Sequence, residues 1–414
     1  MNNASLRPLD GIRVLDLTVA LSGPYATMVL GGMGAEVIRV EAPGGSDISR
    51  NNPPIATKDG LRFGENTEND LNLTTLGRAR NKKSITLDLK STRGRELLMQ
   101  LAKECDVFVE NMSEGATARL KVDYEEVRKA NPRIIYASLK AMGEPSAWPT
   151  LKGMDIIVQA LSGIMETTGP ADGPPIRCGL PIGDMLAPQY LLQGILAALI
   201  YRGRTGEGQH VKVSMLDCLA SWVAVEHFDV LGGQGYPVRS GNFLDRLIPF
   251  GVYQARNGYV AIVAFQGDWF KGLLEAIGRP ELENDPRYST RVERMNRAAE
   301  FNDIIQAWTR LHNCDDIVHA LLDQRGVPCA KVRTPDEVLA DPHLHASGAL
   351  TRLAHPRYGD VNAVGCGLPI QFSASTAQFD QPTMELGTSN DDIYRGLLNL
   401  SPGEMSDLRS ARVI

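Results

Sequence analysis

One aspartate stands where a glycine-containing loop meets a long apolar segment, and its surroundings suit covalent chemistry. Asp184 lies in residues 179–186 (GLPIGDML), at the start of a predicted buried helix over 185–202. A carboxylate at the positive end of a helix stays ionised, and Gly183 has no side chain to keep a ligand away. An ionised carboxylate near a thioester carbonyl is a plausible nucleophile. A helix N-cap is the simpler interpretation of the same position, and the two roles are compatible.

A second glycine cluster, residues 31–36 (GGMGAE), invites comparison with a dinucleotide-binding loop. Such a loop needs a strand, then the glycines, then a helix whose N-terminus faces the pyrophosphate. Here the glycines close a predicted helix and precede a strand, and the third glycine is absent. The cluster therefore predicts a helix end that packs closely on a sheet. We expect no nicotinamide site.

Metal and serine-hydrolase chemistry have little support. His343 and His345 are close in sequence, but no third ligand follows in a recognisable pattern. No G-x-S-x-G motif is present, and we expect no metal. The six cysteines include no C-x-x-C pair, which favours buried thiols and a reducing cytoplasm over disulfides. They stand at positions 105, 178, 218, 314, 329 and 366.

The composition narrows the class of protein further. The chain has 414 residues with 43 basic and 49 acidic side chains, a formal net charge of −6. A general nucleic-acid binder would need a basic surface. No apolar run approaches the roughly 20 residues that span a bilayer, and residues 1–10 lack the apolar core of a signal peptide. We therefore expect a cytoplasmic protein with neither nucleic-acid nor membrane partners.

The elements that would position Asp184 alternate between strands and helices over the first 215 residues. This order is typical of βαβ units with a parallel sheet between two layers of helices. Predicted strands cover 12–17, 36–41, 85–89, 106–110, 134–139 and 209–214, and predicted helices cover 24–33, 94–104 and 185–202. Further along, a strand is predicted at 259–264 and helices at 269–277 and 298–310.

The length exceeds what one hydrophobic core usually serves, so two lobes are expected. We expect an α/β fold with a large N-terminal domain over 1–224 and a smaller α+β domain with linkers over 225–335. The C-terminal segment 336–414 has a strand–loop pattern and would return to the large domain.

Short motifs spread over nearly the whole chain resemble one enzyme family. Each is weak alone, but they occur in a shared order and spacing. They are residues 9–17 (LDGIRVLDL), 22–24 (SGP), 34–41 (GAEVIRVE), 81–84 (NKKS), 87–90 (LDLK), 109–111 (VEN), 131–135 (NPRII), 153–155 (GMD), 159–160 (QA), 183–184 (GD) and 204–209 (RTGEGQ). The sequence is similar to the family III CoA-transferases of the CaiB/BaiF type, a superfamily that includes formyl-CoA transferases and α-methylacyl-CoA racemases.

The resemblance implies a doubly wound, Rossmann-like large domain and an interlocked homodimer. It also implies transfer of CoA from an acyl-CoA thioester to a free carboxylic acid, with Asp184 as the nucleophile. The carboxylate would form an acyl anhydride and then an aspartyl–CoA thioester, and the acceptor acid would reverse these steps. The protein would hold CoA in place and exclude water.

For CoA itself, the resemblance points to Asn111, Arg119 and Lys152 as contacts, with Lys82 and Lys83 as candidates near the phosphates. An anionic cofactor needs local cations even on an acidic protein. Surface lysines that bind only water are the alternative interpretation of the two neighbouring lysines.

Some positions depart from the family pattern. Val19 to Leu21 replace a histidine and a glutamine of the oxalate-active enzymes, and Ala42 replaces an arginine. A run of four glycines is missing after Leu231, which puts a lid at 231–246 in doubt. The first of these changes favours a more apolar acyl group than oxalate or formate. Succinyl-CoA is the leading candidate donor, with a branched, aryl-substituted or dicarboxylic acid as acceptor. Arg239 or Arg246 could hold a second carboxylate.

Two alternatives remain. An α-methylacyl-CoA racemase needs acid–base groups on both faces of the α-carbon. The racemases carry a histidine before the aspartate that matches Asp155, where this chain has Met154, which cannot carry a proton. A non-catalytic CoA-binding subunit is the other alternative, but it would not need to retain Asp184.

Overall fold

The computed structural model describes the 414-residue chain except residues 1–5, 46, 58–59 and 65–70. The chain divides into two compact units. Unit 1 contains residues 1–162, 179–225 and 341–414, and unit 2 contains residues 163–178 and 226–340. Residues 163–178 lie within the range predicted for the large domain, but they group with unit 2. Arg239 connects the two segments of this unit by donating hydrogen bonds to the carbonyls of Glu166, Pro170 and Gly173.

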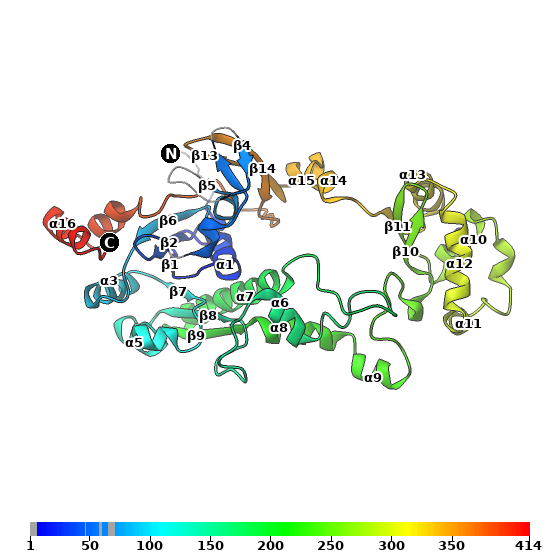
Figure 1. Ribbon diagram of the computed structural model, residues 1–414, viewed down its shortest axis with the longest axis horizontal. Helices are drawn as coiled ribbons and strands as arrows, with labels where there is room; N and C mark the ends of the chain where they lie inside the picture. Colours follow the sequence, from blue (N-terminus) through cyan, green and yellow to red (C-terminus); the bar gives the residue numbers. More distant parts are fainter. Residues whose placement is uncertain (1–5, 46, 58–59, 65–70) are drawn as a thin grey trace. The chain divides into compact units, whose positions relative to one another are not determined.

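A six-stranded sheet forms the centre of unit 1, and all of its neighbouring strands are parallel (Figure 1). The order is β6-β2-β1-β7-β8-β9. The strands are β1 (Arg13–Asp16), β2 (Glu36–Glu41), β6 (Lys82–Thr86), β7 (Val107–Glu110), β8 (Ile135–Lys140) and β9 (Gln209–Ser214). In chain order this is 3-2-1-4-5-6, the doubly wound arrangement in which the direction of winding reverses between β1 and β7.

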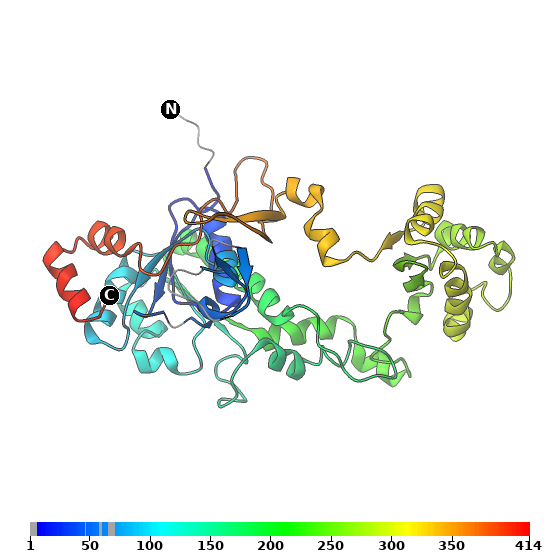
Figure 2. The same cartoon turned by 45° about the horizontal axis from the view of Figure 1, so that its top comes forward.

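One face of the sheet is apolar and is covered by helices. Leu15, Ile38 and Phe108 are fully buried there against Leu98 of α3 (Thr92–Lys103) and Val127 of α5 (Tyr124–Ala130). The end of the chain joins the same core, and α16 (Pro402–Ser410) lies beside α3 in both views (Figures 1 and 2). This segment also pairs with the sheet edge, because the hydroxyl of Tyr394 donates to the carbonyl of Thr86 at 2.8 Å.

The opposite face carries a buried network of charges. Lys82 donates to Asp16 (2.9 Å), to Thr27 (2.6 Å) and to the carbonyl of Pro24 (2.9 Å). Glu41 accepts from Arg50 at 2.7 and 2.6 Å. Arg39 completes the network by contacting Glu41 at 3.3 Å and also pairing with Asp47. Three cations therefore face three carboxylates, so no net charge is buried.

This network explains the one strand that was misplaced from sequence. β6 spans Lys82–Thr86, whereas the apolar run predicted 85–89. Lys82, Ser84 and Thr86 project toward the polar face, where Lys82 donates to Asp16, the Ser84 hydroxyl accepts from the Gly387 amide and the Thr86 hydroxyl accepts from Asn390. Hydrophobicity alone therefore missed the start of the strand.

Two helices cover the network face. α1 (Ser22–Gly32) and α7 (Ile182–Thr205) pack against each other, α1 on β1 and β2, and α7 on β8 and β9. α1 ends at the glycine cluster and β2 follows, so the predicted order of helix, glycines and strand is confirmed. α6 (Asp155–Ser162) and α8 (Met215–Val225) lie beside α7 (Figure 1).

Smaller elements complete unit 1. β13 (Leu350–His355) pairs with β14 (Gly359–Cys366) in an antiparallel hairpin. β3 (Ile55–Thr57) pairs with β4 (Gly60–Arg62) and β5 (Leu71–Asn72), after which α2 (Leu73–Arg78) begins. The side chain of Asn72 caps α2 by accepting from the amides of Thr74 (2.7 Å) and Thr75 (3.2 Å).

Unit 2 has its own antiparallel sheet and core. The sheet contains β10 (Phe250–Ala255), β11 (Gly258–Val263) and β12 (Cys329–Lys331). α10 (Gly267–Ala276) and α12 (Ala298–Thr309) pack on it through fully buried apolar side chains such as Leu273 and Phe301. Within the described residues, no helix of either unit is long and apolar enough to cross a membrane.

Candidate active site

Two loops meet at the carboxyl edge of the sheet, where its winding direction reverses. In doubly wound sheets ligands bind in the crevice at this point. The loop after β1 carries Val19, and the loop after β7 carries Asn111. The amide of Val19 donates to Asn111 Oδ1 at 2.9 Å, and Asn111 Nδ2 donates to the carbonyl of Val19 at 2.9 Å. This pair of bonds fixes the loop that leads into α1.

Asp184 lies inside the first turn of α7, two residues after the helix begins at Ile182. The interpretation of Asp184 as an N-cap is wrong, because Pro181 occupies the cap position. Asp155 performs the capping role from the start of α6. Its Oδ1 accepts from the amides of Gly183 (2.8 Å) and Asp184 (3.2 Å). The Asp184 side chain is therefore not needed for capping.

The carboxylate of Asp184 has one strong partner. Ser22, the first residue of α1, donates from Oγ to Asp184 Oδ1 at 2.9 Å. Burial raises the pKa of Asp184, and the charge of Asp155 raises it further, whereas the Ser22 hydrogen bond and the charge of Arg78 lower it. Among the described residues, Asp184 Oδ2 has no hydrogen-bond partner. Ser22 thus orients one carboxylate oxygen and leaves the other open to a further contact.

Gly183 has a different role from the one expected. It is buried, and a Cβ at this position would lie 3.1 Å from Asp155 Oδ1 and 3.3 Å from the Met215 side chain. The missing side chain therefore lets Asp155 cap the helix closely. It does not open a path for substrate.

A cavity of about 380 Å³ is lined by residues that flank Asp184 and Ser22 in the chain. Leu21, Pro181 and Met185, the sequence neighbours of Ser22 and Asp184, form one side. Arg78 at the end of α2 and the strand β14 form the other. Its volume lies at the lower end of the range of about 300–1,000 Å³ for small-molecule sites.

A second, smaller crevice of about 190 Å³ lies at the same edge of the sheet. Val19, Ala42, Leu89 and Met112, which line it, follow β1, β2, β6 and β7. Leu120, which follows Arg119 in the chain, also lines this crevice.

Three of the five residues predicted to contact CoA lie in loops or at a helix end, outside the sheet core. Asn111 uses both ends of its amide on Val19, which makes it a residue that positions the loop. Arg119 is exposed in the last turn of α4 (Ala116–Leu120). Lys152 is exposed in the loop before α6. Neither cation has an ion-pair partner in the part of the chain that the structure describes.

The other two predicted contacts are placed differently. The Lys82 side chain is only 1% exposed, and its ammonium group makes three hydrogen bonds in the interior, so it cannot reach a phosphate in the solvent. Lys83 is 40% exposed but pairs with Glu36 (2.8 Å) and Asp392 (2.7 Å). It lies near the amino end of β6 and lines a separate pocket of about 600 Å³ there with Asp10, Asp380 and Asp392, whereas the two crevices described above are at the carboxyl edge. We therefore retain neither as a CoA contact.

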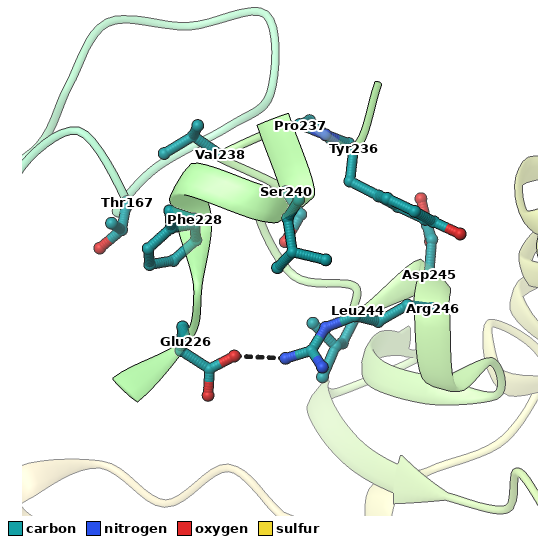
Figure 3. Close-up of a pocket in the computed structure, with 11 residues that line it drawn as sticks. Thr167, Glu226, Phe228, Tyr236, Pro237, Val238, Ser240, Leu244, Asp245 and Arg246 are labelled. Atoms are coloured by element: carbon teal, nitrogen blue, oxygen red, sulfur yellow. Dashed lines mark hydrogen bonds and ion pairs between the residues drawn. The ribbon is translucent and has the colours of Figure 1, made fainter. Parts of the chain in front are cut away.

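The arginines proposed to bind a second carboxylate belong to unit 2, and both have acidic partners there. Arg246 pairs with Glu226 beside a pocket of about 260 Å³ (Figure 3). Arg239 pairs with Glu166 at 2.7 Å and donates to three carbonyls. Nearby, α9 (Phe228–Gly233) occupies the start of the segment where a glycine lid was in doubt.

The remaining candidates carry no cluster of reactive groups. Across the described residues, no group of three potential metal ligands is present. All six cysteines lie in the described part of the chain and none forms a disulfide. Four are buried as expected, but Cys366 is exposed and lines the 380 Å³ cavity.

Asp155 and Arg78 were not recognised from sequence as parts of the site. Asp155 lies in a motif quoted for the resemblance, but its bond to α7 spans 28 residues of chain.

Comparison with known proteins identifies the family. The sequence pattern of CoA-transferase family III matches residues 9–390. The chain belongs to CoA-transferase family III. It is 36% identical over 370 residues to the succinyl-CoA:mesaconate CoA-transferase of Haloarcula hispanica, covering 88% of this chain and 90% of that one. It is 34% identical over 426 residues to the formyl-CoA:oxalate CoA-transferase of Streptomyces coelicolor, covering 99% of each.

The fold of this family III enzyme also matches a solved structure. A crystal structure of a CaiB/BaiF family protein from Brucella suis superimposes with a TM-score of 0.81 and 30% identity. The match covers 94% of this chain and 99% of that one. The family expectation from the sequence motifs is thereby confirmed. Members of the family act on CoA thioesters and carboxylates, so this chain is an enzyme that transfers CoA between them.

Proposed function

We propose that the enzyme transfers CoA through covalent intermediates on Asp184. The observation that carries this proposal is the placement of Asp184: a partly buried carboxylate beside a cavity, with Oδ1 held by Ser22 and Oδ2 without a partner among the described residues. A capping aspartate would instead accept amide hydrogen bonds. Here Asp155 accepts them, which leaves Asp184 for chemistry.

The reaction proceeds by four acyl exchanges that balance in atoms and electrons. Asp184 Oδ2 attacks the thioester carbonyl of the donor, the C–S bond breaks, and an aspartyl–acyl anhydride and CoA thiolate form. The thiolate attacks the aspartyl carbonyl and releases the donor acid, which leaves an aspartyl–CoA thioester. The acceptor carboxylate attacks that thioester and gives a second anhydride and thiolate. The thiolate then attacks the acceptor acyl carbonyl, which forms the new acyl-CoA and restores Asp184.

CoA is expected to lie along the carboxyl edge of the sheet. The 190 Å³ crevice has apolar walls that suit an adenine ring, although Glu41, Asp47, Asp88 and Lys90 also line it. The exposed Arg119 and Lys152 would supply cations for the phosphates. Succinyl-CoA is the proposed donor, since a relative that covers most of the chain is named for it. The acceptor is a carboxylic acid that fits the 380 Å³ cavity.

A homodimer is proposed on the surface of α6, α7 and α8. These adjacent helices expose large apolar side chains that a monomer would leave in water. Examples are Ile156 (50% exposed), Ile200 (60%), Trp222 (46%) and Val225 (68%). A second copy is the partner that the family resemblance implies.

The test is an incubation in D₂O with succinyl-CoA and a mixture of carboxylic acids, followed by mass spectrometry of the thioesters. New acyl-CoA species without deuterium at the α-carbon are expected from transfer. An α-deuterated thioester without any new acyl-CoA would refute the proposal and favour racemase chemistry. CoA binding with neither product would instead indicate a binding subunit.

A further inference from the structure

The cavity beside Asp184 has an apolar body and a single charged group. Leu21, Met185 and Val364 contribute apolar walls, and Arg78 is the only ionisable cation among its lining residues, which include no carboxylate. A small apolar cavity with a few polar groups is typical of a site that recognises a specific ligand. The charge at Arg78 therefore selects for an anionic group on that ligand.

Arg78 differs from the arginines around it because its charge is not neutralised. It is half-buried at the C-terminal end of α2, and within the described residues no carboxylate lies in ion-pair distance. By contrast, Arg50 pairs with Glu41 at 2.6 Å. Arg80 donates to the carbonyl of Cys366 at 2.5 Å and lies over the ring of Phe379. A half-buried guanidinium without a partner is costly unless a ligand supplies one.

The charges of Arg78 and Asp184 act on each other. Burial lowers the pKa of Arg78, and the nearby carboxylates of Asp184 and Asp47 raise it. In turn, the charge of Arg78 is one of the two influences that lower the pKa of Asp184. The cavity itself connects the two groups, because Arg78 lines one side of it and Met185, the residue that follows Asp184 in α7, lines the other.

We propose that Arg78 binds the distal carboxylate of a dicarboxylic acyl group whose reacting carboxyl lies at Asp184, and that it thereby selects dicarboxylic over monocarboxylic substrates. The methylene chain would lie along Leu21 and Met185. The planar guanidinium can bind a carboxylate through two parallel hydrogen bonds. This inference rests on the proposed role of Asp184. Arg78 takes the place of Arg239 and Arg246 as the arginine that binds a second carboxylate, because those two already have acidic partners.

The experiment compares two isotope exchanges that differ only in the distal group. [¹³C]succinate exchanges into succinyl-CoA, and [¹³C]butyrate exchanges into butyryl-CoA, so each reaction has the same acid as donor and acceptor. The measurements are made at a pH well above the range in which protonation of Asp184 lowers activity, because Arg78 also influences the pKa of Asp184. Glutarate and valerate provide a second pair of acids. The wild-type enzyme should favour each diacid. Arg78→Met should lower kcat/KM for the diacids about 100-fold, mainly through KM, because a hydrogen-bonded charge contact is lost.

Matched variants separate a loss of diacid recognition from a general loss of activity or of folding. Exchange of the monoacids by Arg78→Met should stay within about threefold of wild type, and Arg78→Lys should recover part of the diacid activity. Arg93→Met removes an exposed arginine paired with Glu96 and should leave both exchanges unchanged. Thermal unfolding checks that each variant is folded.

An equal loss for diacids and monoacids in Arg78→Met would overturn the inference, because Arg78 would then act only through Asp184. A wild-type enzyme without preference for diacids would overturn it as well. In both cases the proposed function stands if label exchanges. A wild-type enzyme that exchanges label with no acid would instead refute the proposed function itself.

Discussion

Replacing Asp155 with asparagine separates two effects that one side chain has on Asp184. The Asp155 carboxylate caps α7 through the amides of Gly183 and Asp184, and its negative charge raises the pKa of Asp184. Asparagine caps a helix about as well as aspartate, so Asp155→Asn retains the cap and removes the charge. Gln159 must adjust, because its amide nitrogen donates to Asp155 Oδ2 at 2.6 Å and also to the Leu180 carbonyl at 3.4 Å.

The expected result is a change in pH dependence with little change in stability. Asp184 reacts as a carboxylate, so activity falls as the pH drops through its pKa. Burial is the largest cause that raises this pKa, and the Asp155 charge adds to it. Without that charge the pKa of Asp184 falls, and the acid limb of kcat/KM should move to lower pH. Asp155→Ala should show the same shift but also lose about 0.5–2 kcal/mol of stability with the cap.

The assay is kcat/KM for succinate exchange across the pH range, with thermal unfolding of wild type and both variants. An acid limb that stays in place in Asp155→Asn would show that the limb does not report Asp184. A shift to higher pH would contradict the electrostatic reasoning outright. Equal destabilisation of the two variants would contradict the capping role.

Three further predictions concern stability, assembly and CoA binding. Lys82→Met should destabilise the fold by about 3–5 kcal/mol, measured by chemical denaturation, because it leaves a buried carboxylate unpaired; a change in CoA affinity without loss of stability would contradict this. Trp222→Asp should convert the dimer to a monomer in sedimentation experiments, and a wild-type monomer at micromolar concentration would refute the proposed interface. Arg119→Ala and Lys152→Ala should each raise the KM for CoA thioesters several-fold, while Lys83→Ala should not; the reverse pattern would move the CoA site to the other edge of the sheet.

Much of the sheet could be predicted from sequence because its strands are short apolar runs between polar turns. β2 and β9 have the predicted bounds. β6 was misplaced because four of its five side chains are polar and have partners on distant elements, such as Lys82 with Asp16, 66 residues away. Alternation of hydrophobicity cannot reveal a charge network that forms only when three strands come together.

The candidate site was predicted only in part for the same reason. Asp184 stood out because of its local sequence, but the group that caps its helix lies on α6 and the serine that holds it lies on α1. Arg78 gave no local signal, since α2 is short and the β14 residues that line the same cavity as Arg78 lie almost 300 residues further along the chain. Lys82 looked like a surface cation next to Lys83, and only the register of β6 shows that neighbouring residues face opposite sides of the sheet.

The most direct test of the account is to trap the covalent intermediate on Asp184. The enzyme is incubated with succinyl-CoA, treated with hydroxylamine and digested, and its peptides are analysed by mass spectrometry. We expect an aspartyl hydroxamate at Asp184 that requires the thioester and is absent in Asp184→Asn, which should also lose CoA exchange. An active enzyme whose Asp184 peptide stays unmodified, or an Asp184→Asn variant that still transfers CoA at the wild-type rate, would contradict it.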